Sequence, residues 1–254
     1  MEKLSRQPLL EAAFELNWKN MKYPFLDPNY QILIGALYER IRDKFPQFEA
    51  LPTASIPPEA LPPNNRLTQY RFWSPGKTWP VVQVGHGILT INIDKIYEGW
   101  DNFRQTITTV IDIFTNTYPD TQNLFIDKLT LRYINGFYYL GSHSNILEFL
   151  SKYLHINLNI DFDVDFGKQK KLNPSDINLA LTYELHESNT FLNLKTFKGK
   201  VNDEEKLLLE ILVTSNENKS IENFNIHDWL EKAHKIISSV FKSLIRGELE
   251  DELR

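Results

Sequence analysis

Residues 124–139 read LFIDKLTLRYINGFYY, and apolar side chains alternate there with polar ones. Because successive side chains of a strand point to opposite faces of a sheet, this alternation predicts a long β-strand with one buried face. Residues 8–18, PLLEAAFELNW, alternate in the same way near the start of the chain. The two strands begin two segments with the same order of elements, about 120 residues apart, and this repeat decides our prediction of the fold.

In the first segment, apolar residues at helical spacing and a stop at Pro46 predict an amphipathic helix after the strand. A proline-rich loop with a short edge strand at residues 54–56 follows, and then strands at 70–74, 81–85 and 88–93 and a helix at 97–118. The second segment continues with a helix at 145–154, strands at 156–166, 177–186, 191–197 and 207–214, and a helix at 226–245. The acidic residues 247–252 are expected to form a solvated end.

The repeated order predicts an α+β protein built by tandem duplication, with similar halves at residues 1–120 and 121–254. We expect each half to be a curved antiparallel sheet packed by its own long helix. The two halves would pack as one unit about a pseudo-twofold axis, as in saddle-shaped proteins of the TATA-binding type or in a helix-grip arrangement. This likeness concerns topology and carries no function.

The composition is that of a globular protein of the cytoplasm. The 254 residues are 42% hydrophobic and 13% aromatic, which is enough for a large core. The chain has no cysteine, which rules out disulfides, zinc–thiolate sites and thiol nucleophiles. The first residues lack the apolar stretch of a signal peptide, and no apolar run approaches the roughly 18 residues of a membrane span. The net charge of −5 argues against a surface that coats DNA.

Three segments resemble the signature stretches of a sporadically distributed bacterial family of uncharacterised proteins. They are residues 8–15 (PLLEAAFE), 97–103 (YEGWDNF) and 131–135 (LRYIN), and the similarity would extend over nearly the whole chain. In that family the last motif usually continues with an arginine and an apolar residue, whereas Gly136 and Phe137 follow here. The resemblance implies an accessory role in a mobile or defence-related bacterial locus, and it implies no reaction.

Acidic and basic residues occupy the polar faces of the two strands that begin the halves. Glu11 and Glu15 lie opposite the apolar face of the first strand, and Lys128 and Arg132 lie opposite the apolar face of the second. If these strands pair antiparallel, acid meets base across the seam between the halves. We predict a structural bridge there, with a ligand-binding Arg132 as the alternative.

Rings and cations interleave in residues 66–79, where Arg66, Tyr70, Arg71, Trp73 and Lys77 follow one another closely. Such a pattern is typical of surfaces that stack the bases of single-stranded nucleic acid. Core aromatics flanked by solvated charges give the same pattern, and the acidic net charge favours this second interpretation.

A third candidate is a row of carboxylates, Asp161, Asp163 and Asp165, which alternate with apolar residues. On an extended backbone they share one face, and clustered carboxylates bind Mg²⁺ or Mn²⁺. However, alternate side chains of a strand stand about 7 Å apart, too far for all three to hold one small ion. We therefore favour an edge strand whose charged outer face discourages aggregation.

The common catalytic signatures are missing from the sequence. It has no Gly-x-Ser-x-Gly elbow, no P-loop and no dinucleotide-binding glycine motif, and its six histidines do not show a zinc spacing. We predict a non-enzymatic binding or adaptor protein with a protein partner and no cofactor. The alternatives are a single-stranded nucleic-acid binder that uses residues 66–79 and a metal-dependent phosphodiester enzyme that uses the three aspartates.

Overall fold

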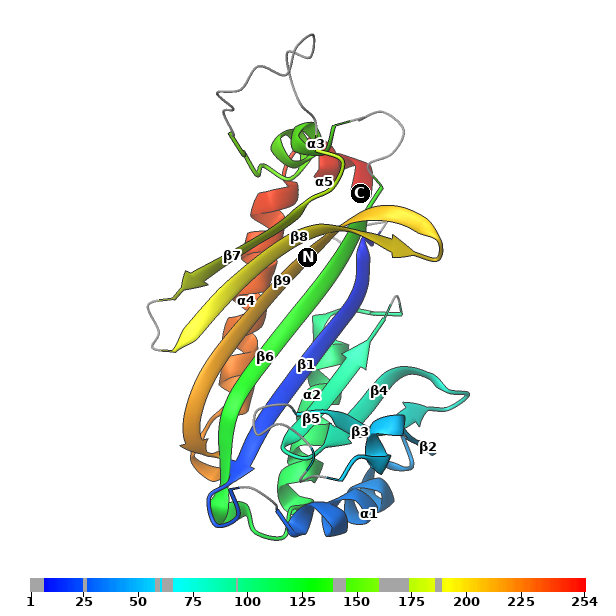
Figure 1. The fold of residues 1–254 in the computed structure, drawn as a ribbon, viewed down its shortest axis with the longest axis vertical. Coiled ribbons are helices and arrows are strands. Elements are labelled where there is room, and N and C mark those ends of the chain that lie inside the picture. The colour runs from blue at the N-terminus through cyan, green and yellow to red at the C-terminus, as the bar shows by residue number, and fades with distance from the viewer. Residues whose placement is uncertain are drawn as a thin grey trace.

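The computed structural model describes residues 7–24, 27–57, 60, 66–94, 96–138, 145–159, 174–185 and 189–254. Their strands form one antiparallel sheet of nine strands, in the order β2-β3-β4-β5-β1-β6-β9-β8-β7 (Figure 1). The strands are β1 (Leu9–Asn20), β2 (Gln47–Ala50), β3 (Thr68–Ser74), β4 (Thr78–Gly85), β5 (Ile88–Ile93), β6 (Leu124–Phe137), β7 (Asn178–Glu184), β8 (Thr190–Val201) and β9 (Glu204–Ser220).

The α-helices are α1 (Asn29–Ile41), α2 (Trp100–Thr117), α3 (Ile146–Tyr153), α4 (Ile226–Ile245) and α5 (Glu248–Leu253). Short 3-10 turns span Pro52–Ser55, Thr121–Asn123 and Ile221–Asn223. Within the described ranges, none of the helices has the length and apolar character needed to cross a membrane.

The expectation of two curved sheets, each packed by its own long helix in a TATA-binding or helix-grip plan, is wrong, because both halves share one sheet. β1 pairs with β5 along one edge and with β6 along the other, so that Phe14 lies between Ile91 and Leu131. This pairing satisfies backbone groups that separate sheets would leave open at their inner edges. The two alternating strands that begin the halves therefore form the middle of the sheet.

The strand order runs outward from this centre in a related way on both sides. From β1 the order is β5, β4, β3 and β2, and from β6 it is β9, β8 and β7. On each side the strand that comes first in the sequence is central, and the strand that comes last lies beside it. Among the residues that the structure describes, the second series has one strand fewer than the first.

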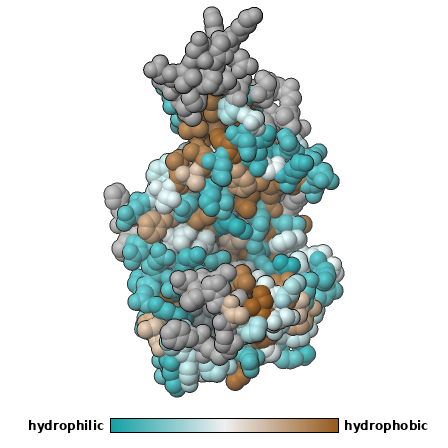
Figure 2. Space-filling model, in the orientation of Figure 1, coloured by the Kyte–Doolittle hydropathy of each residue, from teal (hydrophilic) through white to brown (hydrophobic). Residues whose placement is uncertain are grey.

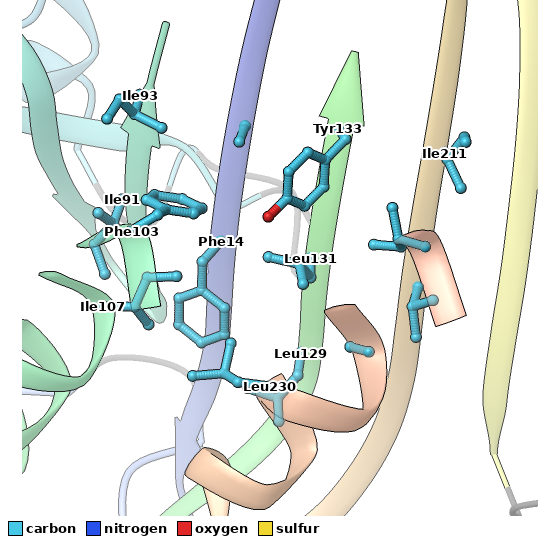
Figure 3. Close-up of a cluster of buried hydrophobic side chains, with 14 of the residues drawn as sticks. Phe14, Ile91, Ile93, Phe103, Ile107, Leu129, Leu131, Tyr133, Ile211 and Leu230 are labelled. Carbon is cyan, nitrogen blue, oxygen red and sulfur yellow. The ribbon is translucent and has the colours of Figure 1, made fainter. Parts of the chain in front are cut away.

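Helices pack on one face of the sheet and supply the other half of the core. Figure 1 shows α2 and α4 behind the strands, with α1 at one end of the molecule and α3 and α5 at the other. The ring of Phe14 lies 6.3 Å from that of Trp229 in α4, and Trp18 lies 4.8 Å from Phe114 in α2. Figure 3 shows Phe14 pointing between helix residues that include Ile107 and Leu230. Each large side chain buried in this way stabilises the fold by roughly 1.5–3 kcal/mol.

Three local expectations differ from the structure. The edge strand is β2, whereas residues 54 and 55 belong to the 3-10 turn Pro52–Ser55 and residue 56 directly follows it. In the expected strand at 156–166, residues 156–159 are not in a strand, and the remainder lies outside the described residues. The expected solvated end is the helix α5, which buries Leu249 and Leu253 because residues four apart share one helix face.

Candidate functional site

The face of the sheet opposite α2 and α4, which we call the polar face, carries most of the charged side chains of the central strands. Because strand residues alternate, Ala13 and Glu15 point to this face while Phe14 between them points into the core. Figure 2 views the molecule from this side and shows hydrophilic side chains interspersed with apolar ones in the middle of the face. The same alternation that forms the core thus also forms a polar surface.

Two acid–base pairs cross the seam between β1 and β6. Lys128 Nζ lies 3.6 Å from Glu15 Oε1, and Arg132 Nη2 donates a hydrogen bond of 3.2 Å to Glu11 Oε1. Both pairs are diagonal, since the residue directly opposite Glu15 is Thr130. The four residues named for this seam from the sequence therefore meet, as two pairs. Because all four side chains are partly exposed, each pair stabilises the fold by no more than about 1 kcal/mol.

A row of side-chain hydrogen bonds continues from Glu11 towards β3. Asn92 Nδ2 on β5 donates to Glu11 Oε1 at 2.7 Å, and Gln83 Nε2 on β4 donates to Asn92 Oδ1 at 3.1 Å. Arg71 Nε on β3 in turn donates to Gln83 Oε1 at 2.7 Å. Glu11 is thus the point where this row meets the seam, because its Oε1 accepts from both Asn92 and Arg132.

On the other side of the seam, Glu210 of β9 links two cations. Its carboxylate oxygens lie 4.0 Å from Arg132 Nη1 and 3.9 Å from Lys195 Nζ on β8. Glu210 is buried, with 9% of its surface exposed, so the two neighbouring cations offset part of the free-energy cost of burying its carboxylate. Together with the row on the first half, these contacts join side chains from β3 to β8.

The polar face is hollowed over its centre. The hollow has a volume of about 430 Å³ and is open to solvent. Six of its lining residues are Glu15, Thr90, Lys128, Thr130, Arg132 and Thr214. They come from both halves of the chain and offer hydroxyl, carboxylate, ammonium and guanidinium groups. Small-ligand pockets span roughly 300–1,000 Å³, so this hollow is large enough for a small molecule or a few residues of a peptide.

The aromatic and basic residues of segment 66–79 do not form one surface. Arg71 and Trp73 lie on the polar face, whereas Tyr70 points to the opposite face and stacks on Phe48. Arg66 Nη1 donates to Asp127 Oδ2 at 2.7 Å at the rim of the hollow. Lys77 lies in the turn between β3 and β4, with its Nζ 3.8 Å from Glu49. Tyr70 and Arg71 are adjacent on a strand and therefore point to opposite faces of the sheet. The rings and cations that follow one another in the sequence are thus divided between the two faces.

The proposed carboxylate row cannot be placed in this arrangement. Asp161, Asp163 and Asp165 lie outside the described residues. Among the residues that the structure does describe, no three side chains of histidine, aspartate or glutamate gather as metal ligands would. His227 and His234, which share α4, have separate surroundings, since His227 lies 3.5 Å from Asp112 and His234 packs on Trp100.

A half-buried aromatic cluster lies on the other side of the sheet, where α2 begins and α4 crosses β6. The imidazole of His234 stacks on Trp100, with ring centroids 4.1 Å apart and planes 4° from parallel. Tyr133 Oη lies 3.4 Å from His234 Nδ1 and 3.2 Å from Tyr97 Oη. Burial lowers the pKa of His234 to about 4 and raises that of Tyr97 to about 12. The cluster is therefore uncharged near neutral pH and joins α2, β6 and α4.

The sequence alone does not reveal a partner for His234, because its six histidines show no recognised spacing. The available signal was indirect: Tyr97 and Trp100 belong to segment 97–103 and Tyr133 belongs to segment 131–135, two of the three segments on which the family resemblance rests. The structure brings both segments against His234. The third segment, residues 8–15, contributes Glu11 and Phe14 to β1, which pairs with β6 in the centre of the sheet.

A scan against models of known protein families found no match to this chain, and a search of curated proteins also found none. The resemblance to a sporadically distributed bacterial family stays a prediction.

Proposed function

We propose that this chain is a binding protein without catalytic activity of its own, and that it holds a polar segment of a protein partner in the hollow of the polar face. The observation that carries the proposal is the hollow of about 430 Å³ over the junction of the two halves. Strands of both halves line it, so a ligand seated there would touch the centre of the fold.

The chemistry of the lining supports recognition of a peptide-like ligand. Threonine hydroxyls at Thr130 and Thr214 can donate and accept hydrogen bonds, as peptide groups require, while that of Thr90 already donates to Asn92 Oδ1 and accepts from Gln83 Nε2. Arg132 and Glu15 add charges of both signs, and their ion pairs with β1 and β6 neighbours hold them in place before a ligand arrives. Such preorganisation lowers the entropy lost when side chains are ordered on binding.

The two alternative functions have less support. Arg71 and Trp73 lie together on the polar face, with the guanidinium 5.8 Å from the Trp73 ring, but Tyr70 of the same segment points to the opposite face of β3. The phosphodiester alternative depends on aspartates outside the described residues. We therefore keep the protein-binding proposal alone.

The test fills the hollow and leaves the rest of the surface unchanged. Tagged wild-type protein, Thr214→Trp and Ser239→Trp are used to recover partners from an extract of the native host, with nuclease treatment and quantitative mass spectrometry. Thr214 lines the hollow, while Ser239 is exposed on α4, so the second variant is a matched control. We expect one protein to be recovered with the wild type and the control and to be reduced at least tenfold with Thr214→Trp.

Thermal unfolding of the three proteins checks that each is folded. If every partner is recovered equally with Thr214→Trp and with the wild type, the hollow is not the binding surface. Recovery of nuclease-sensitive nucleic acid that depends on the hollow, with no protein, would contradict the choice of a protein ligand.

A further inference from the structure

The two ends of the sheet differ in how they are protected against pairing with another strand. β2 forms one edge and has only four residues, among them Glu49, which is bound to Trp73 Nε1 at 2.6 Å. β7 forms the other edge with seven residues, NLALTYE, and lies on the outside of the sheet in Figure 1. Proteins protect edge strands by shortness, lysine, proline or bulges. β7 has neither lysine nor proline, and its pairing with β8 runs without a bulge.

The hydrogen-bond pattern fixes which backbone groups of β7 point outward. Leu185 N donates to Thr190 O at 2.9 Å, so in this antiparallel pair Tyr183, Leu181 and Leu179 also exchange hydrogen bonds with β8. The N–H and C=O groups of the residues between them point away from the sheet. Those residues are Asn178, Ala180, Thr182 and Glu184, and no strand in the described part of the chain pairs with them.

The side chains of β7 are self-complementary. Leu179 and Leu181 face the helix side and pack against the core, and Tyr183 beside them is 49% exposed. If two copies of β7 pair antiparallel about a twofold axis at Leu181, Leu181 meets Leu181 of the second copy and Leu179 meets Tyr183. The one charged residue of the strand, Glu184, then lies opposite Asn178, so no like charges meet.

We propose that the chain forms a twofold homodimer in which β7 pairs with β7 of a second copy and the two sheets become continuous. In this register Ala180 lies opposite Thr182 of the second copy, and Asn178 opposite Glu184. These are the residues whose backbone groups point outward, so each pair exchanges two backbone hydrogen bonds. An isologous contact of this kind closes after two copies and leaves no further edge of β7 to recruit a third. The proposal does not depend on the proposed function.

The first experiment compares two proline variants by light scattering after gel filtration. Ala180→Pro removes an outward N–H without removing a bond to β8, which an edge strand tolerates. Ala50→Pro makes the same change on the other edge, where Leu51 N donates to Gln69 O and Ala50 therefore points outward. We expect twice the chain mass of 29.8 kDa for the wild type and Ala50→Pro, and the single mass for Ala180→Pro.

A second experiment tests the register and uses the absence of cysteine from the chain. Leu181→Cys places two cysteines opposite each other in a non-hydrogen-bonded pair, about 4.5 Å apart at Cα, which suits a disulfide. Ala180→Cys is more exposed but lies two residues out of step with its copy, about 7–8 Å away. We expect mild oxidation to crosslink Leu181→Cys and to leave Ala180→Cys as separate chains.

A monomeric wild type at all accessible concentrations would overturn the proposal, and so would a dimer that persists in folded Ala180→Pro. Crosslinking of Ala180→Cys in preference to Leu181→Cys would overturn the register. Circular dichroism of each variant distinguishes loss of the dimer from loss of the fold.

Discussion

Phe14 and Glu15 are neighbours on β1, yet their environments differ. Phe14 is fully buried against side chains of α2 and α4, whereas Glu15 lines the hollow and lies 3.6 Å from Lys128. Burial of apolar surface is worth roughly 25 cal/mol per Å², while a partly exposed ion pair contributes about 1 kcal/mol or less. The stability of the sheet therefore depends mainly on the helix side, which leaves the polar face free to serve recognition.

The largest effect is expected in the core. Phe14→Ala removes a ring that is packed against Trp229 and should lower the free energy of unfolding by about 3–5 kcal/mol. Glu15→Ala, one residue along the same strand, should lower it by about 1 kcal/mol or less. Urea unfolding of the two variants measures both values. Equal losses would contradict the division of roles between the two faces.

A smaller effect on the helix side depends on pH. Burial lowers the pKa of His234 from 6.5 to about 4, so between these values the unfolded chain binds a proton that the folded protein does not. The contribution of this group to stability is full above pH 6.5 and is lost as the pH falls towards 4, by roughly 2 kcal/mol, because solvent around the half-buried ring reduces the effect of the shift. The charges of Glu231 and Asp101 oppose the shift, and that of Lys242 adds to it.

The measurement compares two histidines of α4. Urea unfolding is followed between pH 7 and pH 4 for wild type, His234→Gln and His227→Gln. His227 is exposed, so His227→Gln should keep the wild-type decline, whereas His234→Gln should flatten it. An unchanged slope in His234→Gln would show that other groups cause the loss.

The positions of most elements could be predicted because their patterns are local. The alternation in residues 124–139 predicted β6, and the helical spacing in residues 226–245 predicted α4. The single sheet could not be predicted in this way, because the pairing of β1 with β6 joins residues more than 100 positions apart. Two separate sheets and one continuous sheet require the same alternation of side chains. They differ only in whether the backbone groups at the inner edges of the two halves are hydrogen-bonded to each other.

The candidate site was predictable in part for the same reason. The charges of Glu11, Glu15, Lys128 and Arg132 could be assigned to one face from alternation, and two central strands pair them. The contribution of Asn92 and Glu210 was not predictable, because single polar residues in β5 and β9 carry no signal until their cross-strand neighbours are known. The contacts of His234 were not predictable from the sequence, because its partners lie on other elements, α2 and β6.

The smallest expected effects lie within the polar face and rank its two seam pairs. Glu11 Oε1 accepts from both Asn92 and Arg132, while Glu15 Oε1 accepts from Asn17 at 3.0 Å and lies near Lys128. Double-mutant cycles with alanine should give a coupling of about 0.5–1 kcal/mol for Glu11 with Arg132. Glu15 with Lys128 should give about 0.5 kcal/mol or less, because the longer contact is a weaker interaction.

High salt separates a charge effect from a packing effect in these cycles. At 1 M salt the Debye length is about 3 Å, so the coupling of the more exposed Glu15 with Lys128 should vanish. The coupling of Glu11 with Arg132 should decrease but persist, because the guanidinium donates a hydrogen bond as well as a charge and Glu210 limits its movement. If both couplings respond equally to salt, Glu11 holds Arg132 no more firmly than Glu15 holds Lys128. The side chains that line the hollow are then not held in place before a ligand binds. If they differ as expected, a ligand would meet one rigid pair at Arg132 and one adaptable pair at Lys128.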